Sequence, residues 1–196
     1  KKEDNALVEI AKTEQISWFR GEEDDVLKRI YDAAIYCDAD YIIEIGGDCP
    51  FVDRSVVDEG VDLLVKNESD FVCNFYPASY PDGIDLSLMT RKCLEKLNKS
   101  AKLKSQRMHP FPFIFNNLDI FSVSNLENER DLSNYRLTLD YKEDFELIKK
   151  IFENLYPVNS MFGLNDIINL LEKQKDLVSL NSKYMLPSQP NTYWNT

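Results

Sequence analysis

Histidine and glycine are scarce in this sequence: its 196 residues include one histidine, His109, and six glycines. Its four cysteines are widely spaced and form no Cys-x-x-Cys pair. A zinc finger needs several cysteine and histidine ligands at short spacings, so the sequence does not favour one. Reduced thiols of a cytoplasmic protein account for the cysteines most simply.

Long apolar runs are also missing. No stretch approaches the roughly 18 apolar residues that a membrane-spanning helix needs. The lysines at positions 1 and 2 are not followed by the hydrophobic region of a signal peptide. We therefore predict a cytoplasmic protein with no membrane partner.

Positive charge is in the minority, with 23 Lys and Arg against 34 Asp and Glu and a formal net charge of -11. Such an acidic surface repels a polyanionic backbone, which argues against general nucleic-acid binding. A small anionic substrate stays compatible with this charge, because one positive pocket or one bound divalent cation reverses the local field.

Helical and strand-like apolar periods alternate along the chain, and hydrophobic residues make up 43% of it. The pattern predicts helices over 24–37, 53–66, 141–155 and 164–173, and strands over 41–45, 70–75 and 136–139. This alternation is typical of an α/β fold with a mainly parallel sheet. We expect one domain over residues 1–182 and an irregular tail over 183–196.

Asp48 directly follows the expected strand 41–45. Ligands of open α/β sheets bind beyond the carboxyl ends of strands, and Gly46 and Gly47 allow a ligand to approach the backbone there. The alternative is a turn in which the Asp48 side chain bonds its own backbone two residues on.

Asp140 follows the expected strand 136–139 in the same way. Its structural alternative is a capping box with Glu143 at the start of the next helix. Two strand-end aspartates in one sheet are also suited to share a magnesium ion, which favours one or two carboxylates together with substrate phosphate oxygens.

Several segments resemble, in order, the cytidylyltransferases of the spore-coat polysaccharide biosynthesis type, which are relatives of the acylneuraminate (CMP-sugar acid) synthetases. The segments are FRGEEDDVLKR (19–29), YIIEIGGDCPFVD (41–53), YPDGID (80–85), Arg107 with His109, and LSNYRLTLDYKEDFELI (132–148). The resemblance extends to about residue 157.

The resemblance implies a Rossmann-like, glycosyltransferase A-like nucleotide-diphospho-sugar transferase fold with a mixed, mainly parallel sheet. It implies transfer of CMP from CTP to an acidic sugar, with release of pyrophosphate. Asp48 and Asp140 would be catalytic residues that hold Mg²⁺, and Gly46 and Gly47 would lie against it. A homodimer is left open.

The resemblance also implies a substrate-binding set. It comprises Asp82, Gly83, Asp85, Arg107, His109 and Arg136. The alternatives are a packed core histidine for His109, a surface charge for Arg107 and a simple turn for Asp82 and Gly83.

The sequence departs from the family at four positions: Glu44 replaces arginine, Gly46 threonine, and Ser87 and Met108 glutamate. The family's first strand and basic phosphate loop are not found, so we expect an N-terminally truncated, catalytically incomplete chain. The rival hypotheses are a non-catalytic homologue and a nucleotide-sugar glycosyltransferase using Asp38 and Asp40.

Overall fold

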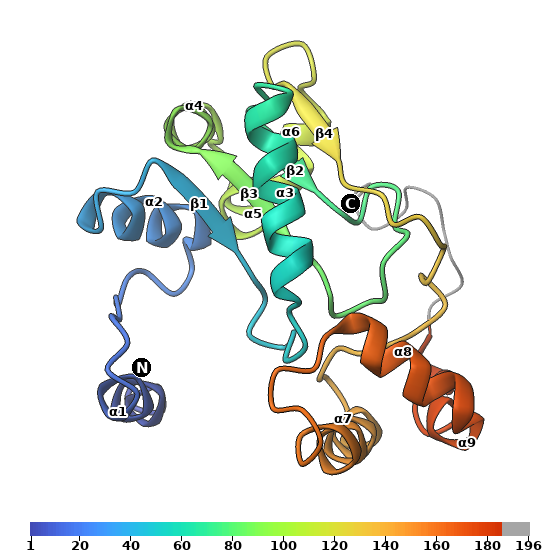
Figure 1. Cartoon of the computed structure of the whole chain (residues 1–196). Coiled ribbons are helices and arrows are strands. Elements are labelled where there is room, and N and C mark those ends of the chain that lie inside the picture. The colour runs from blue at the N-terminus through green and yellow to red at the C-terminus, as the bar shows by residue number, and fades with distance from the viewer. Residues whose placement is uncertain (186–196) are drawn as a thin grey trace.

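The structure is a computed structural model that describes residues 1–185, and its centre is a four-stranded sheet (Figure 1). The strands are β1 (Tyr41–Glu44), β2 (Phe71–Cys73), β3 (Ser87–Thr90) and β4 (Val123–Asn125). Their order is β1-β3-β2-β4. β3 runs antiparallel to β1 and to β2, whereas β2 and β4 are parallel.

The sheet is therefore mixed, as expected, but the expected predominance of parallel pairing is wrong for the described strands. The sequence pattern did not predict β3, which places its four residues between the two expected strands β1 and β2. A strand inserted in the opposite direction converts what would be one parallel neighbour pair into two antiparallel ones.

The expected strand 136–139 is extended chain rather than a member of the sheet. It forms one isolated parallel bridge, between Asp82 and Arg136. The Asp82 N–H donates to the Tyr135 carbonyl at 3.1 Å, and the Leu137 N–H donates to the Asp82 carbonyl at 2.7 Å. Two such bonds hold the segments together without forming a ladder.

The helices expected from the apolar period are present. They are α2 (Val26–Tyr36), α3 (Arg54–Lys66), α7 (Lys142–Leu155) and α8 (Leu164–Lys173). The pattern did not predict α1 (Asn5–Thr13), α4 (Arg91–Ser100), α5 (Lys104–Met108), α6 (Phe111–Phe115) or α9 (Lys175–Val178). Pro110 and Pro112 obscured α6, although proline is compatible with the first turn of a helix.

Helices cover both faces of the sheet, with α3 on one and α2 and α4 on the other (Figure 1). Side chains alternate between these faces along each strand. Val72 and Leu88 pack with the α3, α7 and α8 residues, whereas Phe71 and Met89 pack with those of α2 and α4. The sheet thus separates two apolar cores.

Within residues 1–185, β1 pairs only with β3, so its other edge is open. Tyr41, Ile43 and Ile45 are exposed along it. At the other terminus, Ser182–Tyr184 forms a 3₁₀ helix, and residues 186–196 of the expected tail lie outside the described residues. No helix in the described part of the chain has the length and apolar character to cross a membrane.

Candidate functional site

The loop after β1 presents Asp48 as an exposed side chain. Among residues 1–185, its carboxylate accepts from no backbone N–H group, and its one contact is a weak 3.7 Å bond from the Cys49 thiol. The turn is closed instead by the Cys49 N–H, which donates to the Gly46 carbonyl at 3.1 Å. The self-bonded turn offered as the alternative for Asp48 is therefore not formed.

The backbone of Asp48 lies against the segment that leads to Asp140. Its carbonyl accepts from the Leu139 N–H at 2.9 Å and from the Thr138 hydroxyl at 3.2 Å. Two loops that are 90 residues apart in sequence are thus joined one residue before Asp140. This is the arrangement that a shared ion requires, and the sharing itself stays a prediction.

Asp140 is not the cap of α7. The Oδ2 atom of Asp144 accepts from the N–H groups of both Asp140 and Tyr141, at 3.1 and 2.9 Å, so Asp144 caps the helix. Glu143, the expected partner of Asp140, pairs with Lys183 at 2.6 Å instead. The capping-box alternative is therefore wrong, and the carboxylate of Asp140 remains 47% exposed.

Arg136 connects three aspartates. Its Nη1 donates to Asp82 at 2.9 Å and its Nη2 to Asp140 at 2.7 Å. Its Nε and Nη2 also grip both oxygens of Asp144, at 3.0 and 2.8 Å, in the fork geometry that suits a carboxylate. The side chain is only 7% exposed. Predicted as a substrate-binding residue, Arg136 directs its described contacts to protein carboxylates.

Gly83 makes the close approach between the 80–85 loop and the 136–139 segment sterically feasible. It has a φ of +95°, and a Cβ atom there would lie 2.3 Å from the backbone nitrogen of Thr138. Glycine alone tolerates both conditions. The Gly83 N–H then donates to Asp85 at 3.1 Å, which orients that carboxylate.

The site carries concentrated negative charge. Burial, followed by the nearby charges of Asp82, Asp48 and Glu44, raises the pKa of Asp85 to about 6, against the opposing effect of the Gly83 N–H bond. Burial and the charge of Asp48 likewise raise the pKa of Glu44. These shifts mean that the carboxylates lie close enough to repel one another, a situation that a bound cation relieves.

Two of the four family departures face each other across the sheet. Glu44 of β1 pairs directly with Ser87 of β3. The family's arginine and glutamate at these positions would form a cross-strand ion pair, and opposite charges there stabilise a sheet. Here the uncharged, buried Ser87 leaves no such partner. The β1–β3 register therefore places the two departures directly opposite each other.

The donor set fits magnesium held jointly with a substrate rather than a complete protein cage. Among residues 1–185, no group of three or more His, Cys, Asp or Glu side chains is arranged to hold a metal. Asp48 and Asp140 supply exposed carboxylates from two joined loops. Mg²⁺ is commonly bound by one or two carboxylates together with phosphates and water.

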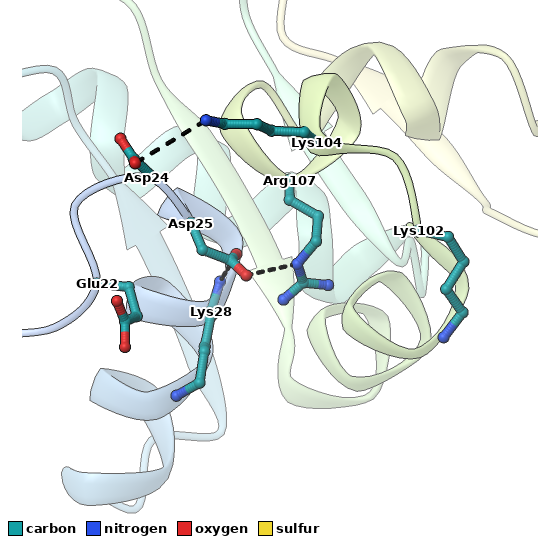
Figure 2. Close-up of a pocket in the computed structure, with 7 residues that line it drawn as sticks. All are labelled: Glu22, Asp24, Asp25, Lys28, Lys102, Lys104 and Arg107. Atoms are coloured by element: carbon teal, nitrogen blue, oxygen red, sulfur yellow. Dashed lines mark hydrogen bonds and ion pairs between the residues drawn. The ribbon is translucent and has the colours of Figure 1, made fainter.

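Arg107 lies in a different part of the molecule, in a pocket of about 500 Å³ lined by charged residues (Figure 2). Its Nε donates to Asp25 at 2.6 Å, and its remaining described contacts are to Asn98 and the Ala101 carbonyl. Asp25 also caps α2 through the Lys28 N–H. Arg107 thus ties α2 to α4, and the structure does not bring it together with Asp48.

His109 is exposed, so the packed-core alternative for it is wrong. Its described contact is structural, since its N–H group closes α5 by donating to the Ser105 carbonyl at 2.9 Å. The Asp38–Asp40 pair of the glycosyltransferase hypothesis binds Arg91, at 2.8 and 3.9 Å. It precedes β1, at the end of the strand opposite to Asp48.

The sequence did not predict Asp144 and Asn181, which support the site from its buried side. Asp144 bonds Arg136, and Asn181 bonds Asp144. Asn181 is 2% exposed and donates to Asp144 at 2.8 Å and to the Arg136 carbonyl at 3.0 Å. An acidic residue in the first turn of α7 was the available signal for Asp144. No local pattern marks Asn181, whose partners are 37 and 45 residues away.

In this α/β fold Asp48 follows β1, Asp140 follows the 136–139 segment, and the glycine-dependent 82–85 loop contacts that segment. Ligands of open α/β sheets bind beyond the carboxyl ends of strands, which is where Asp48 lies. A family model described as "Cytidylyltransferase" matches residues 1–185. The chain belongs to the cytidylyltransferase family and is a nucleotidyltransferase.

The chain is similar to two curated proteins and to one solved structure of a cytidylyltransferase. An uncharacterised protein of Methanocaldococcus jannaschii is 35% identical over 93% of this chain and 74% of its own. Spore coat polysaccharide biosynthesis protein SpsF of Bacillus subtilis is 29% identical over 81% of this chain and 65% of its own. The solved structure of a cytidylyltransferase from Leptospira borgpetersenii superposes with a TM-score of 0.85 at 33% identity, covering 89% of this chain and 74% of that one.

Proposed function

We propose that this protein transfers CMP from CTP to an acidic sugar and releases pyrophosphate, as a step in the biosynthesis of a surface polysaccharide or another glycan. The family assignment supports the nucleotide half of this reaction. The similarity to SpsF of Bacillus subtilis supports the polysaccharide context. The acidic character of the sugar rests on the resemblance to the CMP-sugar acid synthetases.

The observation that carries the proposal is the junction of the Asp48 loop with the segment before Asp140. The hydrogen bonds from Leu139 and Thr138 to the Asp48 carbonyl fix two exposed carboxylates on neighbouring loops. Neither carboxylate caps a helix or closes a turn among the described residues. The Asp48 carboxylate is therefore open to a ligand, and Asp140 offers its second oxygen, because its Oδ2 atom accepts from Arg136 at 2.7 Å.

Charge gives the second argument. CTP carries several negative charges, and a site that contains Asp48, Asp82, Asp85 and Asp140 repels it. A divalent cation held by Asp48 and Asp140 would reverse the local field and allow the triphosphate to bind. When bound, Mg²⁺ supplies electrostatic stabilisation of the charge that develops on the phosphate oxygens.

The protein's own residues then position the reactants. The sugar hydroxyl attacks the α-phosphorus, the new P–O bond joins sugar to CMP, and the bond to the β-phosphate breaks to release pyrophosphate. Asp48 and Asp140 would hold the ion, while Arg136 orients Asp140 and Asp82 by direct hydrogen bonds. The 82–85 loop borders the acceptor side. Holding the hydroxyl near phosphorus supplies much of the acceleration.

The test is pyrophosphate release by the protein expressed from its complete coding sequence. We expect release from CTP only with Mg²⁺ and a sugar acid, and little release with neutral sugars. Asp48→Asn and Asp140→Asn should each lower kcat/KM by about 10²–10³, the cost of losing one main electrostatic contact to the transition state.

Asp62→Asn is the matched control, because Asp62 is an exposed aspartate on α3 outside the site. It should leave turnover unchanged. Parent-like turnover by Asp48→Asn at limiting Mg²⁺ would disprove the metal assignment. Equal turnover of neutral and acidic sugars would disprove the acidic substrate and leave the cytidylyl transfer standing.

A further inference from the structure

The segment after α9 contacts Arg136 and Asp144 on the buried side of the site, mainly through Asn181. Asn181 is 2% exposed, and its amide nitrogen donates to the Asp144 carboxylate and to the Arg136 carbonyl, at 2.8 and 3.0 Å. Both hydrogens of the side-chain amide are therefore used. Asn181, which lies near the end of the domain, thus bonds both the main chain of Arg136 and Asp144, the residue that pairs with the Arg136 side chain.

The contacts continue outward to the exposed carboxylates. Asp144 holds Arg136 through two hydrogen bonds, and Arg136 holds one oxygen each of Asp82 and Asp140. Asp82 and Asp140 are 51% and 47% exposed, whereas Arg136 is 7% and Asp144 0% exposed. The series runs from a buried amide to two carboxylates at the surface.

The same segment grips the start of α7 at a second place. The rings of Tyr184 and Tyr141 stack with centroids 3.9 Å apart and an interplanar angle of 8°. The Tyr184 hydroxyl also donates to Glu143 at 3.1 Å. Tyr141 directly follows Asp140, so residues 181–184 restrain the backbone on the far side of that aspartate.

We propose that Asn181 is a positioning residue for the reaction, which holds Asp140 through Asp144 and Arg136 in the orientation that receives the metal-bound nucleotide. This proposal rests on the proposed function, because it assigns Asp140 to the ion. Partners behind a metal ligand fix its direction, and their loss typically lowers metal affinity by about 10- to 100-fold. Asn181 itself touches neither substrate nor metal.

The test compares CTP binding with and without Mg²⁺ by isothermal titration calorimetry, on the protein expressed from its complete coding sequence. Asn181→Leu removes both donors and keeps the branching and the number of heavy atoms of the side chain. The Mg²⁺-dependent gain is the ratio of the CTP affinity with Mg²⁺ to the CTP affinity without it. We expect this ratio to be about tenfold smaller in Asn181→Leu than in the parent. Affinity for CTP without Mg²⁺ should stay at the parent value, because the variant leaves nucleotide contacts untouched.

Leu170→Ala is the control for simple destabilisation. Leu170 is a buried residue of α8 that belongs to the apolar core and not to the carboxylate network. It should lower the melting temperature and keep the full Mg²⁺-dependent gain. Hydrogen exchange should accelerate locally over residues 136–144 in Asn181→Leu and not in Leu170→Ala.

The outcomes separate the two proposals. A folded Asn181→Leu variant with the parent's Mg²⁺-dependent gain overturns the positioning role and leaves the proposed function intact. A parent protein that shows no Mg²⁺-dependent CTP binding refutes the proposed function itself, and the positioning role with it. If Asn181→Leu does not fold, Asn181→Ser replaces it, because serine keeps one donor. The same comparison of CTP affinity with and without Mg²⁺ then decides the outcome.

Discussion

Replacing Asp144 by asparagine should severely destabilise the fold, because every described contact of this buried carboxylate is a donor. Oδ1 accepts from Arg136 and Asn181, and Oδ2 accepts from Arg136 and the N–H groups of Asp140 and Tyr141. An amide group places N–H hydrogens against at least two of these donors. It also leaves the buried guanidinium of Arg136 without its main counter-charge.

The expected loss in free energy of unfolding follows from the pKa of Asp144 and from its burial. Burial by itself raises the pKa of Asp144, but the bonds from Arg136, Asn181 and the backbone outweigh it and lower the pKa to about 2. A carboxyl group whose pKa falls that far from 3.8 on folding contributes about 2.5 kcal/mol at neutral pH. Breaking a buried ion pair costs about 3–5 kcal/mol, so we expect a loss within that larger range.

Urea unfolding followed by circular dichroism measures this loss. The folded pKa is depressed, so the contribution is complete above the unfolded pKa and disappears as pH falls from about 4 to about 2. The difference between the parent and Asp144→Asn in free energy of unfolding should shrink by about 2.5 kcal/mol over that window. Asp140→Asn is the control, since its 47% exposed carboxylate should cost no more than about 1 kcal/mol. A loss below about 1 kcal/mol for Asp144→Asn at pH 7 would refute the reasoning.

Three further substitutions test other parts of the fold. Gly83→Ala should lower the free energy of unfolding by more than the roughly 1–3 kcal/mol that the positive φ costs by itself, because its Cβ atom would also clash with the backbone of Thr138. Thermal unfolding that matches the parent would contradict the close approach. Asp53→Ala should cost about 1–3 kcal/mol in urea unfolding, because Asp53 accepts from Ser55 at the start of α3 and from Leu164 at the start of α8. Arg107→Met should lower the free energy of unfolding by about 1–3 kcal/mol through the loss of charged hydrogen bonds, and so lower the melting temperature, while the KM for CTP stays unchanged. A raised KM with parent stability would restore the substrate role of Arg107.

The sequence located Asp48 and Asp140, but the structural alternatives that it offered for them, a self-bonded turn and a capping box, are not formed. Strand-end position and the neighbouring glycines singled out Asp48, and the apolar run before it singled out Asp140. The capping motif at Asp140 failed as an explanation because Asp144, one residue beyond Glu143, accepts from the Asp140 and Tyr141 N–H groups, whereas Glu143 pairs with Lys183. Local motifs propose such bonds, and side-chain placement in three dimensions selects among them.

Motif order also grouped residues that the fold separates. Arg107 follows the 80–85 loop in the sequence and is predicted beside it, yet it pairs with Asp25 in a pocket whose lining includes no residue of that loop (Figure 2). Glu44 and Ser87 were two unrelated departures in the sequence, and the β1–β3 register makes them neighbours. Such pairings depend on strand order, which periodicity does not contain.

The sequence by itself determined the α/β class, the helices α2, α3, α7 and α8, and the positions of Asp48 and Asp140. These features follow from apolar period and from residues a few positions apart, which local sterics and hydrogen bonding govern. Only the tertiary structure decided the antiparallel insertion of β3 and the network of Arg136, Asp144 and Asn181. Its members meet because the 136–139 segment, α7 and the chain near α9 pack in the same apolar core. Contacts 37 and 45 residues apart leave no local pattern in the chain.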